Sequence, residues 1–263
     1  MAGLDYYNEN FIQVNKNTNL LQSIEIMKDN GISHLIIVNE KGVLTGVISE
    51  KDIITKLSSK RILSLNPSSL HISSMVARKP EILTDFIDYK TAIEILLNKN
   101  IGCLPVVIDD KVKAIITKHD LVMAGKNIEA SVEEYMTHNV LKLDASERLV
   151  HVTRIMMEKT YSSIPVVSSG RIIGIITDTS LMDTWLNFYK LVRSLDRDYR
   201  VRNVLLRDII SRDIYTISPK DKISDAVSIF LKEKAKSILI QEEGELVGIL
   251  TKSDVLRAIL EKS

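Results

Sequence analysis

Four stretches of the sequence carry a hydroxyl residue followed, three positions on, by another short polar residue. The pairs are Ser49 and Asp52, Thr117 and Asp120, Thr177 and Ser180, and Thr251 and Asp254. A hydroxyl followed by an acid at this spacing can cap the start of a helix. The N–H groups at a helix start can also bind phosphate, and a nearby carboxylate can accept hydrogen bonds from both hydroxyls of a ribose. The motif therefore allows two interpretations, a structural cap and a nucleotide site.

Cations next to these motifs are compatible with the second interpretation. Lys51, Lys118, His119 and Lys252 fall in the first turn of the helix that each motif predicts. A cation there is usually unfavourable, because the helix dipole is positive at this end. A bound phosphate would offset that cost, although solvent-exposed side chains are the simpler explanation.

The motifs recur because the chain repeats itself four times. The repeated passages are GISHLIIVNEKGVLTGVISEKDII, IGCLPVVIDDKVKAIITKHDLV, YSSIPVVSSGRIIGIITDTSLM and KSILIQEEGELVGILTKSDVL. Each repeat predicts a short β segment, an amphipathic helix, two apolar strands around a polar turn, and a second helix that begins at the hydroxyl residue. The fold class is therefore α/β (α+β), with a β-α-β-β-α pattern. One such unit is too small to bury its own sheet, so we expect the repeats to pair.

The order of elements and the endings GVISEKD, AIITKHD, GIITDTS and GILTKSD resemble the CBS domain, a module first named from cystathionine β-synthase. The resemblance covers residues 8–57, 72–126, 132–186 and 205–262, and leaves 187–204 as a linker between repeats 3 and 4. In repeat number the chain is similar to the regulatory gamma subunit of AMP-activated kinase. The resemblance implies two pseudo-two-fold Bateman modules, formed by repeats 1 and 2 and by repeats 3 and 4. It also implies adenine nucleotides or related adenosyl ligands in the clefts between paired repeats.

The resemblance implies a role for each of several residues. The motif acid holds the ribose (Asp52, Asp120, Asp254), and repeat 3 departs from the pattern because Ser180 replaces its acid. The resemblance assigns phosphate binding to the hydroxyls near the helix start and to side chains just before the first long strand (Ser49, Thr117, Thr251, Ser253, His34, Lys236, Ser237). Adenine lies against the start of the partner repeat: Ile12 and Val14 face Asp120, Ile82 faces Asp52, and Thr137 and Val140 face Asp254. Ordinary strand packing is the alternative for each of these apolar positions.

Composition excludes several other classes of protein. Lys+Arg at 35 against Asp+Glu at 34 gives no basic footprint for general nucleic-acid binding. No apolar run could span a membrane, and the start, MAGLDYYNENF, lacks the pattern of a secretory signal. The single Cys103 suits a reducing cytoplasm, and we expect it in the core. The histidines form no metal-ligand spacing, and neither a P-loop nor a GxSxG motif is present, so neither a metal site nor an enzyme is indicated.

Two connecting segments remain. Residues 58–71 are rich in serine and predict a loop, and 182–208 predict a helical extension followed by a linker. The stretch 190–212 holds seven basic residues against three acidic ones, which is typical of a solvated linker. Docking of RNA, DNA or an acidic partner is the alternative for this stretch.

These observations predict a regulatory sensor without a catalytic domain. AMP, ADP, ATP or a related adenosyl molecule is its ligand, and no catalytic cofactor is expected. A partner protein or a second copy of the chain reads out the bound state. The alternatives are a ligand-independent assembly scaffold and a nucleic-acid-associated factor that uses the basic 190–212 segment.

Overall fold

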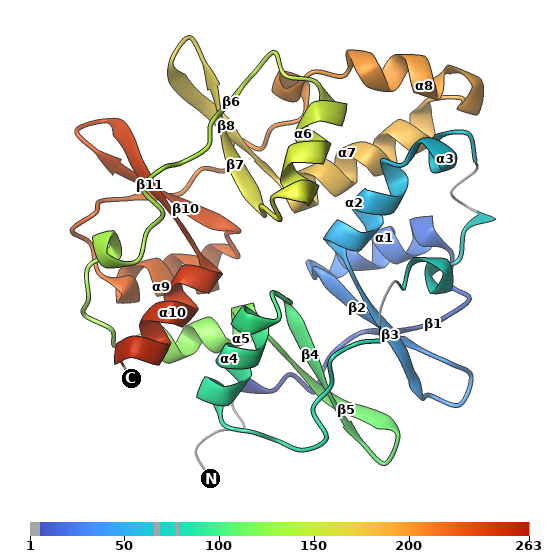
Figure 1. The fold of residues 1–263 in the computed structure, drawn as a ribbon, viewed down its shortest axis with the longest axis horizontal. Coiled ribbons are helices and arrows are strands. Elements are labelled where there is room, and N and C mark those ends of the chain that lie inside the picture. The colour runs from blue at the N-terminus through green and yellow to red at the C-terminus, as the bar shows by residue number, and fades with distance from the viewer. Residues whose placement is uncertain (1–5, 66–68, 77–78, 263) are drawn as a thin grey trace. The chain divides into compact units, whose positions relative to one another are not determined.

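The computed structural model describes residues 6–65, 69–76 and 79–262, and contains four repeats of the same element order (Figure 1). Repeat 1 consists of β1 (Gln13–Asn15), α1 (Leu20–Asn30), β2 (His34–Val38), β3 (Leu44–Ser49) and α2 (Glu50–Leu57). Repeat 2 consists of α4 (Tyr89–Asn98), β4 (Cys103–Ile108), β5 (Lys111–Thr117) and α5 (Lys118–Val122). Repeat 3 consists of β6 (Leu143–Asp144), α6 (Leu149–Glu158), β7 (Ser163–Ser168), β8 (Arg171–Thr177) and α7 (Asp178–Leu191). Repeat 4 consists of β9 (Thr216–Ile217), α9 (Ile223–Glu233), β10 (Ser237–Glu242), β11 (Glu245–Thr251) and α10 (Lys252–Lys262). The β-α-β-β-α pattern is thereby confirmed.

Each repeat forms a small sheet around an antiparallel hairpin. The first strand adds to the hairpin in parallel, as in β1–β2, β6–β7 and β10–β9. In repeat 2 the first strand shrinks to Leu83, which still exchanges two backbone hydrogen bonds of 2.8 Å with β4. The turns of repeats 2 and 4 place two successive residues at positive φ, Asp109–Asp110 and Glu243–Gly244. This is the geometry that a tight hairpin with right-handed strand twist requires.

The four repeats form two compact units, and each unit has its own core. Unit 1 comprises 1–11, 81–141 and 213–263, and unit 2 comprises 12–80 and 142–212. Unit 1 thus holds the helices and hairpins of repeats 2 and 4, and unit 2 those of repeats 1 and 3. In unit 2, α2 packs on α7, and in unit 1, α5 packs on α10. The compact units therefore combine alternate repeats, whereas the sequence predicts modules of consecutive repeats.

Consecutive repeats are instead connected by an exchange of their leading segments. Asn8 pairs with Ile115 of repeat 2, and Thr137 pairs with Ile249 of repeat 4. The exchange is reciprocal, because Ser211, which precedes repeat 4, pairs with Ile175 of repeat 3. A Cβ at Gly174 would lie 2.7 Å from the backbone oxygen of Ser211, so only glycine permits this approach. The leading segments thus connect consecutive repeats, and the predicted modules of repeats 1 with 2 and 3 with 4 stay a prediction.

Both connecting segments contain more helix than the sequence predicts, although the helical extension expected from 182 is present in α7. The predicted loop at 58–71 contains a helix, α3 (Lys60–Leu63), in which Ile62 and Leu63 are buried; residues 66–68 of this stretch lie outside the described part. The predicted linker continues α7 to Leu191 and then forms α8 (Arg197–Arg200), with Tyr189 and Arg197 buried. Phe188 and Tyr189 extend the core of unit 2, whereas Leu195 and Tyr199 further along the segment are exposed. Cys103 is buried as expected, and burial raises the pKa of its thiol to about 12.

Candidate functional site

All four hydroxyl motifs cap a helix. In repeat 2 the Oδ2 atom of Asp120 accepts from the backbone N–H of Thr117 at 2.8 Å and from its hydroxyl at 2.6 Å. Asp52 and Asp254 make the same two contacts with Ser49 and Thr251. In repeat 3 the hydroxyl of Ser180 replaces the carboxylate and accepts from the N–H of Thr177 at 2.9 Å. The cap uses only one carboxylate oxygen, so the other can bind a ligand.

The second carboxylate oxygen has a different environment in each repeat. Asp52 is exposed and Asp120 is half-buried, and within the described chain the Oδ1 atom of neither has a hydrogen-bond partner. Asp254 is only 2% exposed, and its Oδ1 pairs with Arg257. Burial raises the pKa of Asp254, and hydrogen bonds from Thr251 oppose the shift. A ribose at Asp254 would therefore have to replace Arg257, whereas Asp120 can accept one directly.

Unit 1 brings two of the predicted sites together at the starts of α5 and α10. The Nζ atom of Lys118, at the start of α5, donates to the hydroxyl of Ser253 in the first turn of α10 at 2.9 Å. Lys252 donates to the carbonyl of Ala235 at 2.8 Å, and its Nζ lies 5.6 Å from the centre of the Phe230 ring. Two lysines thus lie at the helix starts of repeats 2 and 4.

His119 adds a third basic group to this cluster. Burial lowers the pKa of His119, and the positive charges of Lys252 and Lys234 lower it further, while Asp120 opposes them. Burial, assisted by these positive charges, therefore favours the neutral form of the imidazole. We define Lys118, His119, Lys252 and Ser253 as the basic cluster.

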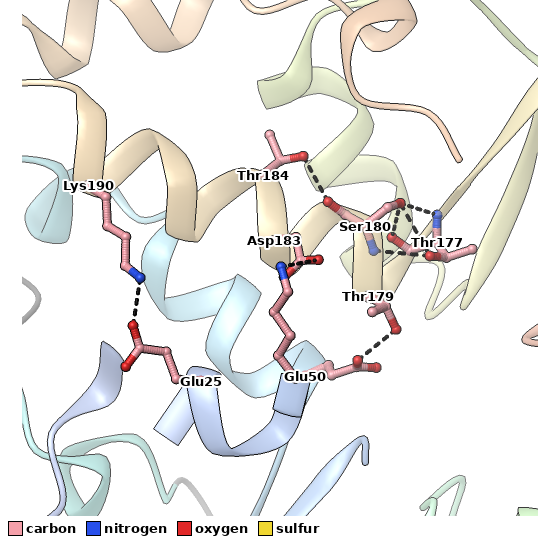
Figure 2. A network of polar contacts seen from close by, with 9 residues as sticks. Glu25, Glu50, Thr177, Thr179, Ser180, Asp183, Thr184 and Lys190 are labelled. Atoms are coloured by element: carbon pink, nitrogen blue, oxygen red, sulfur yellow. Dashed lines mark hydrogen bonds and ion pairs between the residues drawn. The ribbon is translucent and has the colours of Figure 1, made fainter. Parts of the chain in front are cut away.

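Unit 2 places acids at the equivalent positions. The residues that follow the hydroxyl are Glu50 and Asp178, and both are buried. Figure 2 shows Glu50 on α2 accepting a 2.7 Å hydrogen bond from the hydroxyl of Thr179 on α7. The Nζ atom of Lys51 donates to the carbonyl of Thr160 at 2.6 Å. The Glu50–Thr179 contact thus occupies in unit 2 the position that the Lys118–Ser253 contact occupies in unit 1, with an acid in place of the lysine. The negative charge of Glu50 makes the start of α2 unfavourable for phosphate.

The remaining phosphate candidates lie next to the motifs in their own repeats. The strand register places His34 opposite Ser49 and Ser237 opposite Thr251. His34 and Lys236 are half-buried, and Ser237 is buried. The hairpin therefore brings each candidate to the end of the sheet at which the following helix begins.

The adenine candidates have different environments. Thr137 exchanges backbone hydrogen bonds of 2.9 and 3.0 Å with Ile249, and it shares unit 1 with Val140 and Asp254. Val14 is a core residue of unit 2 that pairs with Ile37, which fits the strand-packing alternative. Ile12 and Val14 lie in a different unit from Asp120, and Ile82 lies in a different unit from Asp52. The facing of these groups remains a prediction.

The sequence analysis missed the charge difference between the helix starts of the two units, and it missed the Arg257 ion pair. Both signals are present in the sequence: the residue after each hydroxyl is Glu50, Lys118, Asp178 or Lys252, and Arg257 follows Asp254 at helical spacing. What the sequence lacked was the grouping of alternate repeats, without which these charges do not form pairs.

Among the described residues, no group of His, Cys, Asp and Glu side chains could hold a metal ion. No helix in that part of the chain is long and apolar enough to cross a membrane.

Comparison with known proteins identifies the repeats. The model of the CBS domain family matches residues 2–59, 72–127, 132–187 and 206–261. The uncharacterized protein MJ1225 of Methanocaldococcus jannaschii is 26% identical over 95% of both chains. A 33.4 kDa protein from a ribosomal RNA operon of Thermofilum pendens is 24% identical over 92% of this chain and 86% of its own.

Solved structures agree with this comparison. The crystal structure of MJ1225, described as a candidate archaeal homologue of γ-AMPK, superposes with a TM-score of 0.84 at 25% identity, covering 95% of this chain and 96% of that one. A conserved protein of Pyrococcus horikoshii has the same fold, with a TM-score of 0.62 at 18% identity over 97% of this chain and 98% of its own. Proteins with CBS domains are commonly regulatory and bind adenosyl ligands.

Proposed function

Since the chain belongs to the CBS-domain family, with four CBS domains along its length, we propose that it is a non-catalytic sensor of adenine nucleotides. AMP, ADP, ATP or a related adenosyl molecule binds beside the helix starts and changes how the chain engages a partner. A ligand can produce such a change only through unequal affinity for two arrangements of the protein. Proteins of the CBS-domain family are typically regulatory and non-catalytic, which supports regulation rather than catalysis.

The basic cluster of unit 1 carries this proposal. Lys118 and Lys252 begin two helices, and the 2.9 Å contact of Lys118 with Ser253 brings these helix starts within reach of one ligand. Backbone N–H groups, hydroxyls and cations are the donors that phosphate prefers. Asp120 adds an acceptor suited to a ribose at the same place. Inorganic phosphate alone would not use that carboxylate, so the combination favours a nucleotide.

The helix starts of unit 2 favour the second candidate function, ligand-independent assembly, for repeats 1 and 3. Glu50 and Lys51 are engaged by Thr179 and by the Thr160 carbonyl, which ties α2 to repeat 3 without any ligand. We propose that unit 2 is mainly a scaffold and that the nucleotide response originates in unit 1.

Calorimetric titration of the full chain with AMP, ADP, ATP, S-adenosylmethionine and methylthioadenosine tests the proposal. We expect saturable binding of at least one nucleotide, and loss of most of it when Lys118 and Lys252 are both changed to Met. The control is Lys51→Met, which removes a cation from unit 2. If the folded protein binds none of the five, or if Lys51→Met weakens binding as much, the proposal is wrong.

Mass spectrometry of molecules released from the denatured protein provides an independent check. An adenosyl compound recovered from the wild type but not from the double variant would support the site. Recovery in equal amounts from both would place the ligand elsewhere.

A further inference from the structure

Unit 2 has a surface, away from the motif helix starts in the sequence, that the proposed nucleotide sensor does not use. It lies on the segment that follows α7, where α8 packs beside α3 (Figure 1). Leu191, Leu195 and Tyr199 of this segment are 83%, 93% and 76% exposed. All other exposed large hydrophobic side chains in the described chain are at most 45% exposed. Large apolar side chains exposed to this extent within nine residues of one another in sequence suit an interaction site.

The segment is held firmly, so the exposure is not that of a loose linker. Its anchor is the buried guanidinium of Arg197, which donates to the carbonyls of Leu65, Val192 and Tyr189 at 2.7, 2.9 and 3.1 Å. It also lies 4.7 Å from the centre of the Tyr189 ring. The hydroxyl of Tyr189 in turn donates to the carbonyl of Leu57 at 2.7 Å. The exposed side chains are therefore displayed on a fixed platform.

A groove of about 400 Å³ adjoins the exposed leucine. It is lined by Lys60 and Leu63 of α3, by Ser64 after it, and by Ser194, Leu195, Asp198 and Arg202 from the platform. The lining thus combines two leucines with charged and hydroxyl side chains. Such a mixture fits a helix that lays an apolar face against the protein.

The charge around the groove decides what kind of helix fits. Lys60, Arg61, Arg193, Arg200 and Arg202 are exposed here, while the nearby acids Asp196 and Asp198 are paired with Arg193 and Arg202. The surface is therefore net positive. A second copy of this chain, related by a two-fold axis, would bring this positive surface against itself. The exposed leucines would gain nothing from a nucleic-acid backbone, which is polar.

We propose that this surface, lined by α3 and residues 191–202, docks an acidic amphipathic helix of a partner protein. Leu195 enters the apolar face of that helix, and the surrounding Lys and Arg side chains pair with its acids. This surface provides the contact through which a regulatory chain could act on another protein, and it is independent of the nucleotide site.

Fluorescence anisotropy tests the proposal with the full chain and a fluorescein-labelled helical peptide that carries Leu on one face and Glu on the others. We expect saturable binding that Leu195→Ala weakens at least about tenfold, as for a central interface residue. Lys60→Glu should weaken it as well. The matched controls are Leu141→Ala and Lys41→Glu, at exposed sites elsewhere, and neither should change the affinity.

Further probes separate the competing occupants. A peptide with Lys in place of Glu, a single-stranded RNA, and phosphatidylserine vesicles should each bind more weakly than the acidic peptide. Analytical sedimentation measures the oligomeric state of the wild type and of Leu195→Ala. We expect the same state for both proteins. The proposal would be overturned if the Lys peptide bound equally well, or if RNA or vesicles bound more strongly. It would also be overturned by a dimer that depends on Leu195, or if the acidic peptide showed no saturable binding.

Discussion

The motif acids illustrate how one side chain can serve two roles. Asp120 caps α5 with one carboxylate oxygen and leaves the other available, while Asp254 gives its second oxygen to Arg257. The structural and functional interpretations of the motif are therefore compatible in repeat 2. In repeat 4 the ion pair competes with a ligand for the same oxygen.

This difference predicts that Asp120 matters more for binding than Ser180. A hydrogen bond to a charged group contributes roughly 1.5–3 kcal/mol, so Asp120→Asn should weaken nucleotide affinity about 10- to 150-fold. Ser180→Ala, which removes only a neutral cap, should leave the affinity nearly unchanged. Calorimetry on both full-length variants measures this. Equal losses would mean that the motif acts only as a cap.

His119 predicts how stability depends on pH. Its pKa in the folded protein lies below the ordinary value of 6.5, because burial and Lys252 disfavour the charged form. Between the two values the unfolded chain binds more protons than the folded one. The stabilising contribution is therefore complete above about pH 6.5 and is lost as the pH falls through the folded pKa.

Urea denaturation at several pH values checks this expectation. The free energy of unfolding should fall below pH 6.5 more steeply in the wild type than in His119→Gln. Bound nucleotide should reduce the difference, because phosphate favours the protonated imidazole. Identical pH profiles for the two proteins would show that His119 is not the titrating group.

At the scale of helices, the starts of α5 and α10 differ in charge from those of α2 and α7. Lysines follow the hydroxyls in unit 1, and acids follow them in unit 2. Lys118→Met should therefore weaken ATP binding more than AMP binding, since ATP carries more phosphate charge. Competition titrations of the two nucleotides against the variant give the ratio. A uniform loss for both ligands would argue that Lys118 does not contact the outer phosphates.

The Arg197 anchor predicts a stability effect in the platform. Arg197→Met removes three charged hydrogen bonds to backbone carbonyls and should lower the free energy of unfolding by about 1.5–3 kcal/mol or more. Arg193→Met is the matched control, because its side chain is 85% exposed and pairs with the carboxylate of Asp196. Urea midpoints measure both effects. A loss in Arg193→Met equal to that in Arg197→Met would contradict the anchoring role.

At the scale of the whole molecule, the chain cannot be divided between repeats 2 and 3 without cost. Each unit takes one hairpin and helix pair from either half, so a fragment of residues 130–263 exposes the faces of α7 and α10 that pack on α2 and α5. We expect this fragment alone to bind a hydrophobic dye and to unfold at lower temperature than the full chain. Co-expression with residues 1–129 should restore a stable complex. A separate fragment as stable as the full chain would contradict this arrangement.

The sequence determined the repeats, their element order and their caps. These features depend on local rules: the period of apolar residues distinguishes helix from strand, and a hydroxyl with a polar residue three positions on starts a helix. The burial of Cys103 and the family followed from the same passages. The first strands were less well predicted, because a strand of two or three residues such as β9 or β1 depends on its neighbour rather than on its own pattern.

Only the tertiary structure decided which repeats share a core and which side chains meet at the helix starts. Partner choice depends on the fit of apolar faces that follow the same pattern in all four repeats, so this pattern does not distinguish repeat 3 from repeat 2 as the partner of repeat 1. That choice brings Lys118 beside Ser253 and Glu50 beside Thr179, so the helix starts of unit 1 carry a basic side chain where those of unit 2 carry an acidic one. The same holds for residues 187–204, which the sequence predicts as a linker. In the structure Tyr189 and Arg197 of this segment donate hydrogen bonds to the carbonyls of Leu57 and Leu65, more than a hundred positions away.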